Sequence, residues 1–251
     1  IESTNKNGHF KCVIPTFRND LEREVDLSEE IARVIGYDNI PSSTNFSASY
    51  ASFVEDDQKL DTLVRSKLQA NSYYEHYSNS LQHESYTQHF SGGTAVKLKN
   101  PLSQDMEFIR NSIIPGLLNA ASYNEKRQEK NFKLFEIGSI HNQSNKSSTG
   151  SNERFHLGLI WYGDKILHWR KYENRDIFRY KGEVSQILRS IGIEDISFKI
   201  GKQIGFNTSV KIYSGKTLIG NMGIPDAMIL NSYDLNEVPV VCDLYLYLIR
   251  D

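Results

Sequence analysis

Four of the seven acidic residues in one short stretch of this chain, "RNDLEREVDLSEEIARVIGYDNIP" at residues 18–41, are spaced so that their carboxylates could lie close together. Offsets of three, four and seven residues bring side chains onto one face of a helix, so Asp26, Glu29 and Glu30 would lie side by side. Asp20, just upstream, could join them. Mg²⁺ binds carboxylate oxygens and keeps several of its waters, and a cation would offset the repulsion between crowded carboxylates. One interpretation of this stretch is therefore a magnesium site.

The same residue types also suit the start of a helix. Asp26 would be the N-cap residue, and Glu29, three positions later, would complete a capping box. Carboxylates in the first turn also interact favourably with the positive end of the helix dipole. The opposite face, with Leu27, Ile31 and Val34, would then be buried. From the residues alone, the capping and the metal interpretations both stay open.

The composition indicates a globular protein without a strong overall charge. The 251 residues are 39% hydrophobic, and 29 basic against 31 acidic residues leave a formal net charge of −2, which excludes a global attraction to nucleic acid or anionic membranes. Cys12 and Cys242 form neither a zinc motif nor a disulfide framework, which favours a reducing cytoplasm. No segment approaches the ~20 apolar residues of a membrane span. The opening residues resemble a strand rather than a signal peptide, which suggests a fragment of a longer chain.

The elements that would position these residues alternate between helices and strands. A strand at 10–15 and a helix at 27–35 form a small unit, and the serine-rich segment 42–52 is expected to link it to a second one. An exposed loop is expected at 141–153. Helical spacing predicts further helices near 56–70, 115–127 and 177–193, and strand patterns occur at 73–81, 95–102, 107–110, 132–141, 155–163, 196–201, 209–215, 217–225 and 238–249. The expected fold class is α+β with a mainly antiparallel sheet.

The acidic stretch also carries a dense motif beyond its carboxylates. It matches the pattern Pro-Ser-x-Arg-x-Asp, an acidic segment, Asp-Leu-x-Glu-Glu-x-Ala-Arg and Gly-Tyr-x-x-Ile-Pro at Pro15, Thr16, Arg18, Asp20, Asp26, Leu27, Glu29, Glu30, Ala32, Arg33, Gly36, Tyr37, Ile40 and Pro41. The stretch therefore resembles the end of the metal-binding, winged-helix-like domain in the beta subunit of bacterial phenylalanyl-tRNA synthetase. The resemblance implies that Asp20, Asp26, Glu29 and Glu30 are magnesium ligands.

A second match lies in "NPLSQDMEFIRNSIIPGLLNAASYNEKRQEKNFKLFEIG" at 100–138, and it is independent of the first. Its positions are Asn100, Pro101, Leu102, Ser103, Met106, Arg110, Ser112, Pro115, Gly116, Asn124, Arg127, Phe135, Glu136 and Gly138. A weaker match is "FRYKGEVSQIL", preceded by Trp169. The chain departs from the family at "GFNTS" (205–209) and "GIPDA" (223–227), where histidine-proline elements are usual.

The resemblance implies two domains and a subunit role. Residues 1–45 would be the C-terminal part of the metal-binding domain, and 46–251 a catalytically inactive, class II synthetase-like core with an antiparallel sheet flanked by helices. The implied function is that of a structural core of a phenylalanine-tRNA ligase beta subunit in the cytoplasm. Its partner, the alpha subunit of an alpha2-beta2 heterotetramer, would use ATP to charge tRNA(Phe) with phenylalanine, and the cofactor expected in this chain is Mg²⁺.

The helix near 56–70 resembles the class II dimerisation motif. Its apolar side chains could lie at a subunit contact or in an ordinary core, since amphipathicity does not identify what covers a face. The residues concerned are Leu60, Leu63, Val64 and Leu68.

The residues give no sign that this chain itself is catalytic. A class II site needs a glycine-rich strand followed by Glu-Arg, and "TLIGNMGIPDAM" has Gly220 and Gly223 without that pair. Arg110 and Arg127 are better explained by packing at a helix start and by surface solvation than by nucleotide binding. No catalytic or cofactor-binding residue is therefore assigned. Two alternative functions are a nucleic-acid-binding winged-helix-like module, which the near-neutral charge disfavours, and a stand-alone class II-like ligase.

Overall fold

The computed structural model describes residues 1–47, 58–163 and 177–249. Contacts divide the chain into two compact units, Ile1–Glu55 (unit 1) and Asp56–Asp251 (unit 2), and each is described by itself. Three features named above lie outside the described residues in whole or in part: Trp169, the end of the expected linker, and the first residues of the helix expected at 56–70.

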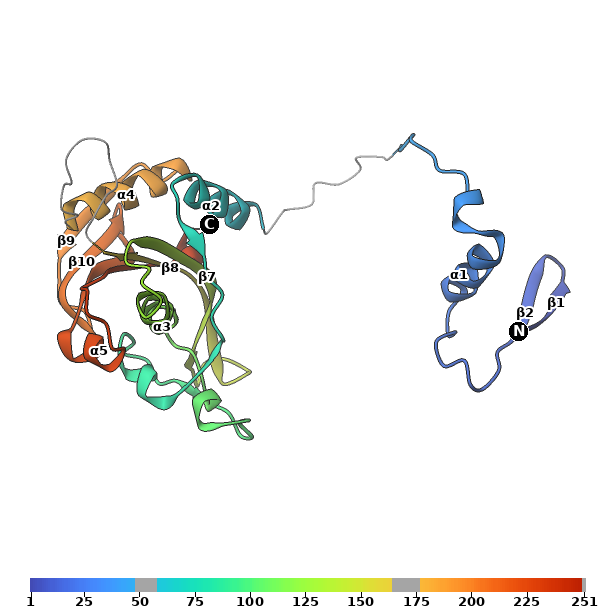
Figure 1. Cartoon of the computed structure of the whole chain (residues 1–251), viewed down its shortest axis with the longest axis horizontal. Coiled ribbons are helices and arrows are strands. Elements are labelled where there is room, and N and C mark those ends of the chain that lie inside the picture. Colours follow the sequence, from blue (N-terminus) through green and yellow to red (C-terminus); the bar gives the residue numbers. More distant parts are fainter. Residues whose placement is uncertain (48–57, 164–176, 250–251) are drawn as a thin grey trace. The chain divides into compact units, whose positions relative to one another are not determined.

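Over residues 1–47, unit 1 contains a hairpin and one α-helix (Figure 1). Strands β1 (Glu2–Lys6) and β2 (His9–Val13) pair antiparallel. Asn7 and Gly8 between them have φ of 54° and 85°, as a two-residue hairpin turn requires. Helix α1 (Glu24–Ile35) follows, and a short 3-10 turn spans Tyr37–Asn39. The sequence predicted β2 but not β1.

The expected buried face of α1 is not observed within unit 1. No residue of α1 is buried, and the side chains of Ile31 and Val34 are 61% and 89% exposed; Leu27 is only half-buried. A hairpin and a single helix bring too few apolar side chains together to cover this face.

Unit 2 is built on a seven-stranded sheet within the described residues, in the order β3-β7-β8-β12-β11-β10-β9. Only the β3–β7 pair is parallel. The strands are β3 (Tyr74–Glu75), β7 (Phe132–Gln143), β8 (Ser151–Tyr162), β9 (Ile196–Ile200), β10 (Phe206–Ser214), β11 (Thr217–Pro225) and β12 (Val240–Leu244). The mainly antiparallel α+β fold expected from the sequence is therefore confirmed.

In the part of unit 2 that the structure describes, a small second sheet and four helices accompany the large sheet. The small sheet has the order β4-β6-β5, with β4 (Leu81–Gln82), β5 (Val96–Lys97) and β6 (Phe108–Ile109). The helices are α2 (Lys59–Ala70), α3 (Ile114–Glu125), α4 (Ile177–Ser190) and α5 (Ala227–Ser232), and short 3-10 turns lie at Glu84–Gln88, Gln104–Met106 and Leu246–Leu248. No described helix is both long enough and apolar enough to cross a membrane.

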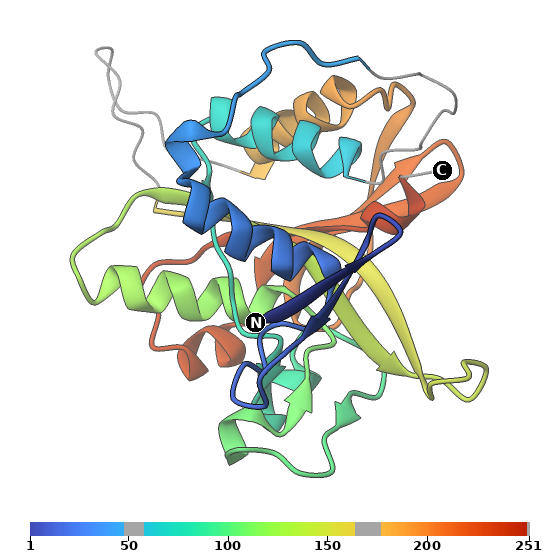
Figure 2. The ribbon, with the colours of Figure 1, turned by 90° about the vertical axis from the view of Figure 1, so that its right-hand side faces the viewer.

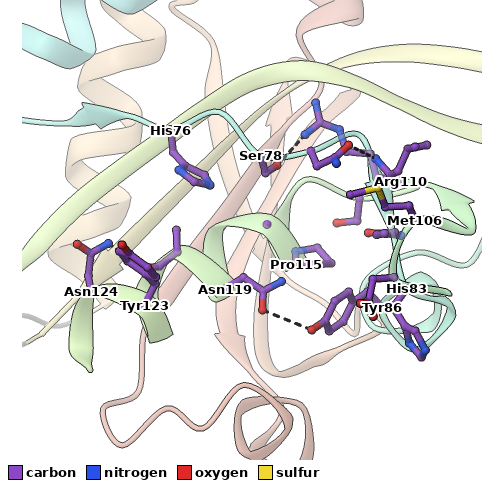
Figure 3. Close-up of a pocket in the computed structure, with 17 residues that line it drawn as sticks. His76, Ser78, His83, Tyr86, Met106, Arg110, Pro115, Asn119, Tyr123 and Asn124 are labelled. Carbon is purple, nitrogen blue, oxygen red and sulfur yellow. Dashed lines mark hydrogen bonds between the residues drawn. The ribbon is translucent and has the colours of Figure 1, made fainter. Parts of the chain in front are cut away.

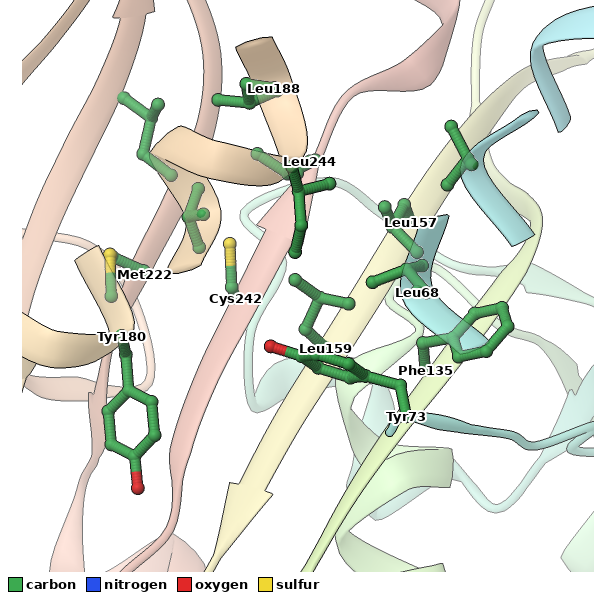
Figure 4. Packing of buried hydrophobic residues seen from close by; sticks show 14 of the residues in the cluster. Leu68, Tyr73, Phe135, Leu157, Leu159, Tyr180, Leu188, Met222, Cys242 and Leu244 are labelled. Carbon is green, nitrogen blue, oxygen red and sulfur yellow. The ribbon is translucent and has the colours of Figure 1, made fainter. Parts of the chain in front are cut away.

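The helices cover the two faces of the large sheet. Helices α2 and α4 lie on one face, and α3 and α5 lie on the other (Figure 2). The α2–α4 face holds a core that includes Leu68, Phe135, Leu159 and Met222 (Figure 4). The α3–α5 face holds a second core built around α3, with Ile113, Leu117, Leu118, Ile160, Tyr162 and Leu230.

Polar contacts attach α4 to the sheet. Glu183 of α4 accepts hydrogen bonds from the Tyr73 hydroxyl at 2.7 Å and from Trp161 Nε1 at 3.1 Å. Lys133 Nζ lies 3.2 Å from the same carboxylate. Burial opposes ionisation of Glu183, but the Tyr73 hydrogen bond and the Lys133 charge together leave its pKa below the usual value. This network connects α4 with β7, with β8 and with the segment between α2 and β3.

Several boundaries differ from the sequence prediction. The strand expected at 73–81 is reduced to Tyr74–Glu75, and the last strand ends at Leu244, where the chain enters a 3-10 turn. Strands β7 and β8 extend into the loop expected at 141–153, and α5 was not predicted. The atypical segments 205–209 and 223–227 lie beside each other, because Phe206 is paired with Pro225.

Replacing Gly158 by alanine should destabilise unit 2. A Cβ at this position of β8 would lie 2.5 Å from Ile113 Cγ2 and 2.9 Å from Leu117 Cδ1, where α3 meets the sheet. Overpacking of this kind costs about 1–3 kcal/mol, which urea denaturation followed by circular dichroism would measure.

Gly182→Ala is the matched control, because nothing lies within 4 Å of its Cβ position on α4. Alanine should stabilise that helix by up to about 1 kcal/mol. A Gly158→Ala variant as stable as the parent chain would show that α3 does not approach β8 this closely.

Candidate functional site

The predicted metal ligands lie among arginine side chains. Arg18 donates from Nε to both oxygens of Asp20, at 2.9 and 3.2 Å, and from Nη2 to Asp20 Oδ2 at 2.7 Å. The same Nη2 donates to Glu30 Oε1 at 2.7 Å. One guanidinium therefore bridges two of the four carboxylates, and it lowers the pKa of Asp20 to about 2 and also lowers the pKa of Glu30.

Asp26 stabilises the start of α1 from inside the helix. Its Oδ2 accepts the backbone N–H groups of Glu22 and Arg23 at 3.0 and 2.8 Å, and these bonds lower its pKa. The N-cap residue is Arg23, so Asp26 is the third helical residue. The prediction that Asp26 is the N-cap residue was wrong, because α1 begins earlier than its apolar pattern indicated.

Glu29 is paired along the helix and does not complete a capping box. Its Oε1 accepts from Arg33 Nη2 at 2.9 Å, and both side chains are more than half exposed. Arg33 Nη1 also lies 3.6 Å from Glu30 Oε1. Glu30 is therefore in reach of two arginines, one on α1 and one before it.

The donor chemistry of this region fits Mg²⁺, but the side chains are arranged around arginines. Asp20 and Glu30 converge on one cationic group, whereas Asp26 and Glu29 bind other partners. In the ranges that the structure describes, no three His, Cys, Asp or Glu residues are grouped so that they could hold a metal ion. The assignment of Asp20, Asp26, Glu29 and Glu30 as magnesium ligands stays a prediction.

A second candidate site is a cavity of about 860 Å³ in unit 2, between α3 and the segment that follows β3. Figure 3 shows His76, Tyr123 and Asn124 at one end and His83 and Tyr86 at the other. Asn119 of α3 lies between these ends, and its Oδ1 is 3.5 Å from the Tyr86 hydroxyl. This cavity was not predicted from the sequence, because its walls come from segments that are far apart in the chain.

Arg110 forms a buried ion pair at the wall of this cavity. Its Nη1 lies 2.5 Å from Glu136 Oε1, and the two side chains are 7% and 2% exposed. Ser78 donates its backbone N–H and its hydroxyl to Glu136, and Arg110 Nε donates to the Ser139 carbonyl at 2.9 Å. The bonds satisfy both charges, which is the condition for a stable buried pair.

This pairing decides what the cavity can bind. Among the described residues that line it, Arg110 is the only lysine or arginine, and its charge is neutralised by Glu136. The remaining polar lining consists of amides, hydroxyls, two histidines and Asp105. A phosphate would find no unpaired lysine or arginine among these residues, because Glu136 binds the Arg110 guanidinium just before α3. That Arg110 binds no nucleotide stays a prediction.

The sequence did not identify Ser78 and Glu136 as the partners of Arg110. A charged residue inside the apolar strand "FKLFEIG" is the signal that could have found Glu136, since a buried carboxylate needs a partner. Arg127, the other arginine considered, lies with its Cζ 3.3 Å from the centre of the Tyr123 ring, and Tyr123 is 58% exposed. It is a surface residue.

Two family models match this chain. A family model described as the phenylalanyl tRNA synthetase beta chain CLM domain matches residues 40–246. A second, described as the tRNA synthetase B5 domain, matches residues 1–37.

Curated relatives agree with these matches. The chain is 29% identical to the phenylalanine–tRNA ligase beta subunit of Neisseria gonorrhoeae over 239 residues, covering 94% of this chain and 30% of the relative. It is 31% identical to that of Desulfotalea psychrophila over 253 residues, covering 92% and 31%. The chain thus spans about 30% of the length of the curated relatives it matches.

A solved structure of similar fold is pyrrolysyl-tRNA synthetase from Desulfitobacterium hafniense. It has a TM-score of 0.59 at 15% identity and covers 75% of this chain and 66% of that one. At this identity the likeness concerns the fold alone, and it confirms the synthetase-like fold expected from the sequence.

Breaking the Arg110–Glu136 pair should strongly destabilise unit 2. Arg110→Met or Glu136→Gln alone leaves a buried partner without its opposite charge, which typically costs about 3–5 kcal/mol. The double variant Arg110→Met/Glu136→Leu should recover part of this loss, because it leaves no buried charge. Urea denaturation of all three variants would measure these differences.

Lys126→Met is the matched control, since Lys126 and its partner Asp234 are 58% and 76% exposed. It should change stability by less than about 0.5 kcal/mol. Single variants at Arg110 and Glu136 that behaved like this control would rule out a buried pair.

Proposed function

Because this chain belongs to the phenylalanyl-tRNA synthetase beta chain family, we propose that it forms the structural core of a phenylalanine–tRNA ligase beta subunit. The core would pair with the catalytic alpha subunit in an alpha2-beta2 heterotetramer. In that assembly the alpha subunit would use ATP to charge tRNA(Phe) with phenylalanine. The observation that carries this proposal is the family match over most of unit 2.

A non-catalytic role agrees with the chemistry of the unit 2 cavity and of the glycine-containing strand. Glu136 neutralises Arg110, so that guanidinium is not available to a nucleotide phosphate. Gly220 on β11 lies where a Cβ would come within 2.6 Å of the Asp243 carbonyl on β12. Close strand packing therefore accounts for this glycine without a bound nucleotide.

We propose that the outer side of α2 and β3 meets the alpha subunit. Val64 and Leu68 are fully buried in the core of unit 2, so they are not available to a partner. Leu63 on the same helix is 37% exposed, and Tyr74 and Tyr77 are 69% and 73% exposed. Exposed tyrosines with a neighbouring leucine are typical of protein interfaces.

We further propose the domain division expected from the sequence, with the metal-binding domain at 1–45 and the core domain at 46–251. The separation of contacts into Ile1–Glu55 and Asp56–Asp251 supports it. The family models, at 1–37 and 40–246, support it as well. The proposed location is the cytoplasm, where Cys12 and Cys242 would remain the free thiols that they are here.

We also propose that Asp20, Asp26, Glu29 and Glu30 of unit 1 form the Mg²⁺ site. Four carboxylates in one segment are the oxygen donors that Mg²⁺ prefers. When bound, the ion would neutralise part of their charge and hold the segment before α1 against the helix.

Co-purification tests the subunit role. The chain and the alpha subunit from the same genome should co-elute in size-exclusion chromatography with light scattering. Leu63→Glu/Tyr74→Glu should weaken the complex at least about tenfold, because charges would replace apolar contacts at its centre. Leu102→Glu is the control, since Leu102 is 91% exposed and belongs to neither α2 nor β3. A folded parent chain that does not bind the alpha subunit would contradict the proposal.

Thermal unfolding tests the metal site. Mg²⁺ should raise the melting temperature of the parent chain, because a ligand that binds only the folded state stabilises it. Glu29→Gln/Glu30→Gln should abolish this rise. Glu22→Gln/Glu24→Gln removes the same charge from exposed neighbours and should preserve it. An equal rise in both double variants would leave Glu29 and Glu30 with a purely structural role.

A further inference from the structure

The cavity of unit 2 is lined by a buried side chain whose hydrogen bonds the protein does not complete. Gln82 of β4 lines this cavity and is only 8% exposed. Its Nε2 donates to Asn111 Oδ1 at 3.3 Å, and its Oε1 has no hydrogen-bond partner among the described residues. We propose that the cavity binds a small uncharged ligand that presents a carboxamide to Gln82 and an apolar body to the surrounding walls.

The orientation of the Gln82 amide is set by its neighbour. Asn111 is 1% exposed, and its Nδ2 donates to the carbonyls of Thr87 at 2.7 Å and Gly93 at 3.2 Å. Since both N–H groups of Asn111 are used in this way, its Oδ1 must be the acceptor, and Gln82 must turn Nε2 toward it. A flipped Gln82 would place two oxygens against each other. Gln82 Oε1 is therefore held on the side that has no protein donor.

Gln82 Oε1 is accessible from the cavity. Among the described residues, the fully enclosed side-chain atoms without a hydrogen-bond partner are His156 Nε2 and Asn221 Oδ1. Gln82 Oε1 is not one of them, so it is not fully enclosed, and the space that Gln82 lines is the cavity. Polar groups of buried side chains ordinarily have hydrogen-bond partners. An accessible acceptor on a buried side chain therefore indicates a binding position for a ligand donor.

A carboxamide would find matching groups beside Gln82. A primary amide has N–H donors and a C=O acceptor on adjacent atoms, and Gln82 offers Oε1 and its second Nε2–H in the same way. Ser112 is 3% exposed and lines the same cavity. Its Oγ accepts from the Ile114 backbone N–H at 3.3 Å, but its own O–H has no acceptor among the described residues. These groups suit a ligand that both donates and accepts.

The charges of the lining favour an uncharged ligand. Arg110 is the only lysine or arginine among the described residues of the lining, and Glu136 binds it. Asp105, the carboxylate of the lining, is exposed to solvent. An anion would therefore find no unpaired lysine or arginine in this part of the chain, and a cation would find no buried carboxylate among the lining residues. Burying a charge without a partner is costly.

The volume and the walls of the cavity suit a small molecule. The cavity measures about 860 Å³, which falls within the range of roughly 300–1,000 Å³ for small-molecule sites. Figure 3 shows Met106, Pro115 and Tyr86 around this space. The apolar and aromatic lining consists of Leu81, Met106, Pro115, Ala120, Tyr86 and Tyr123. A ring or a short aliphatic body would be buried against these walls while its amide binds Gln82.

Three probes of similar shape test the inference on the parent chain. Benzamide carries a carboxamide on an apolar ring, benzoate carries an anion in its place, and benzamidine carries a cation. In ¹⁵N NMR titrations at about pH 8, where free imidazole is neutral, benzamide should shift the side-chain amide resonance of Gln82. Benzoate and benzamidine should bind at least about tenfold more weakly, because each brings a charge into a site without an opposite one. The side-chain amide of Gln143, which donates to the Ala95 carbonyl at 3.1 Å outside the lining, is the internal reference and should not shift.

Substitution of Gln82 gives a second test. Gln82→Met keeps a similar length without the amide and should weaken benzamide binding at least about tenfold. Gln88→Met is the matched control, since Gln88 is exposed and does not line the cavity, and it should change the affinity less than about twofold. Gln82→Met also removes the donor to Asn111, so circular dichroism checks its folding. The titrations of the parent chain decide the question if this variant does not fold.

Each other outcome overturns the inference. No shift of Gln82 with benzamide would mean that the cavity holds only water. Benzoate binding as tightly as benzamide would mean that Arg110 is open to anions, and equally tight benzamidine would mean that negative charge selects the ligand. Unchanged benzamide affinity in a folded Gln82→Met variant would place the binding elsewhere. All these outcomes leave the proposed subunit role untouched.

Discussion

The buried ion pair between Arg110 and Glu136 is the interaction on which the arrangement at the edge of unit 2 depends. It joins the segment before α3 to β7, and Ser78 adds the segment that follows β3. A buried charge without its partner is very costly, so these segments must meet in one geometry. The geometry also explains Gly116, since a Cβ at this position of α3 would lie 2.7 Å from Ser78 Cβ. The parallel sheet edge, α3 and the cavity all adjoin this pair.

The arginine–carboxylate pairs of the two units differ in burial. In unit 2 the arginine is buried and permanently neutralised, so the adjoining cavity offers aromatic and neutral polar groups with only one carboxylate, Asp105. In unit 1 the arginine–carboxylate pairs are partly exposed and therefore weak. Such exposed pairs contribute little to stability, whereas the loss of either partner of the buried pair would be costly.

Local patterns predicted the long elements of unit 2 well. Pro115 marked the first turn of α3, and the apolar runs of β7, β8 and β11 predicted those strands. Elements whose form depends on distant partners were predicted less well. Only two residues of the tyrosine-rich segment after Tyr73 pair with β7. Leu230 of α5 belongs to the same buried cluster as residues of α3 and β12. Asp26 was wrongly predicted to be the N-cap residue. Its side chain suits a helix start, but α1 begins two residues earlier, at Glu24, and capping propensity alone does not determine where a helix begins.

The sequence by itself determined the fold class, the family and the set of carboxylates in unit 1, because periodicity and motif spacing are local properties of the chain. Only the tertiary structure decided which charges meet. Arg110 and Glu136 are 26 residues apart, and Arg18 and Glu30 are 12 apart, so no local pattern could pair them. Pairing also decides the chemistry, since a carboxylate bound to arginine and a carboxylate open to a cation are identical in sequence. The physical reason is that electrostatic energy depends on distance and burial, which exist only once the chain has folded.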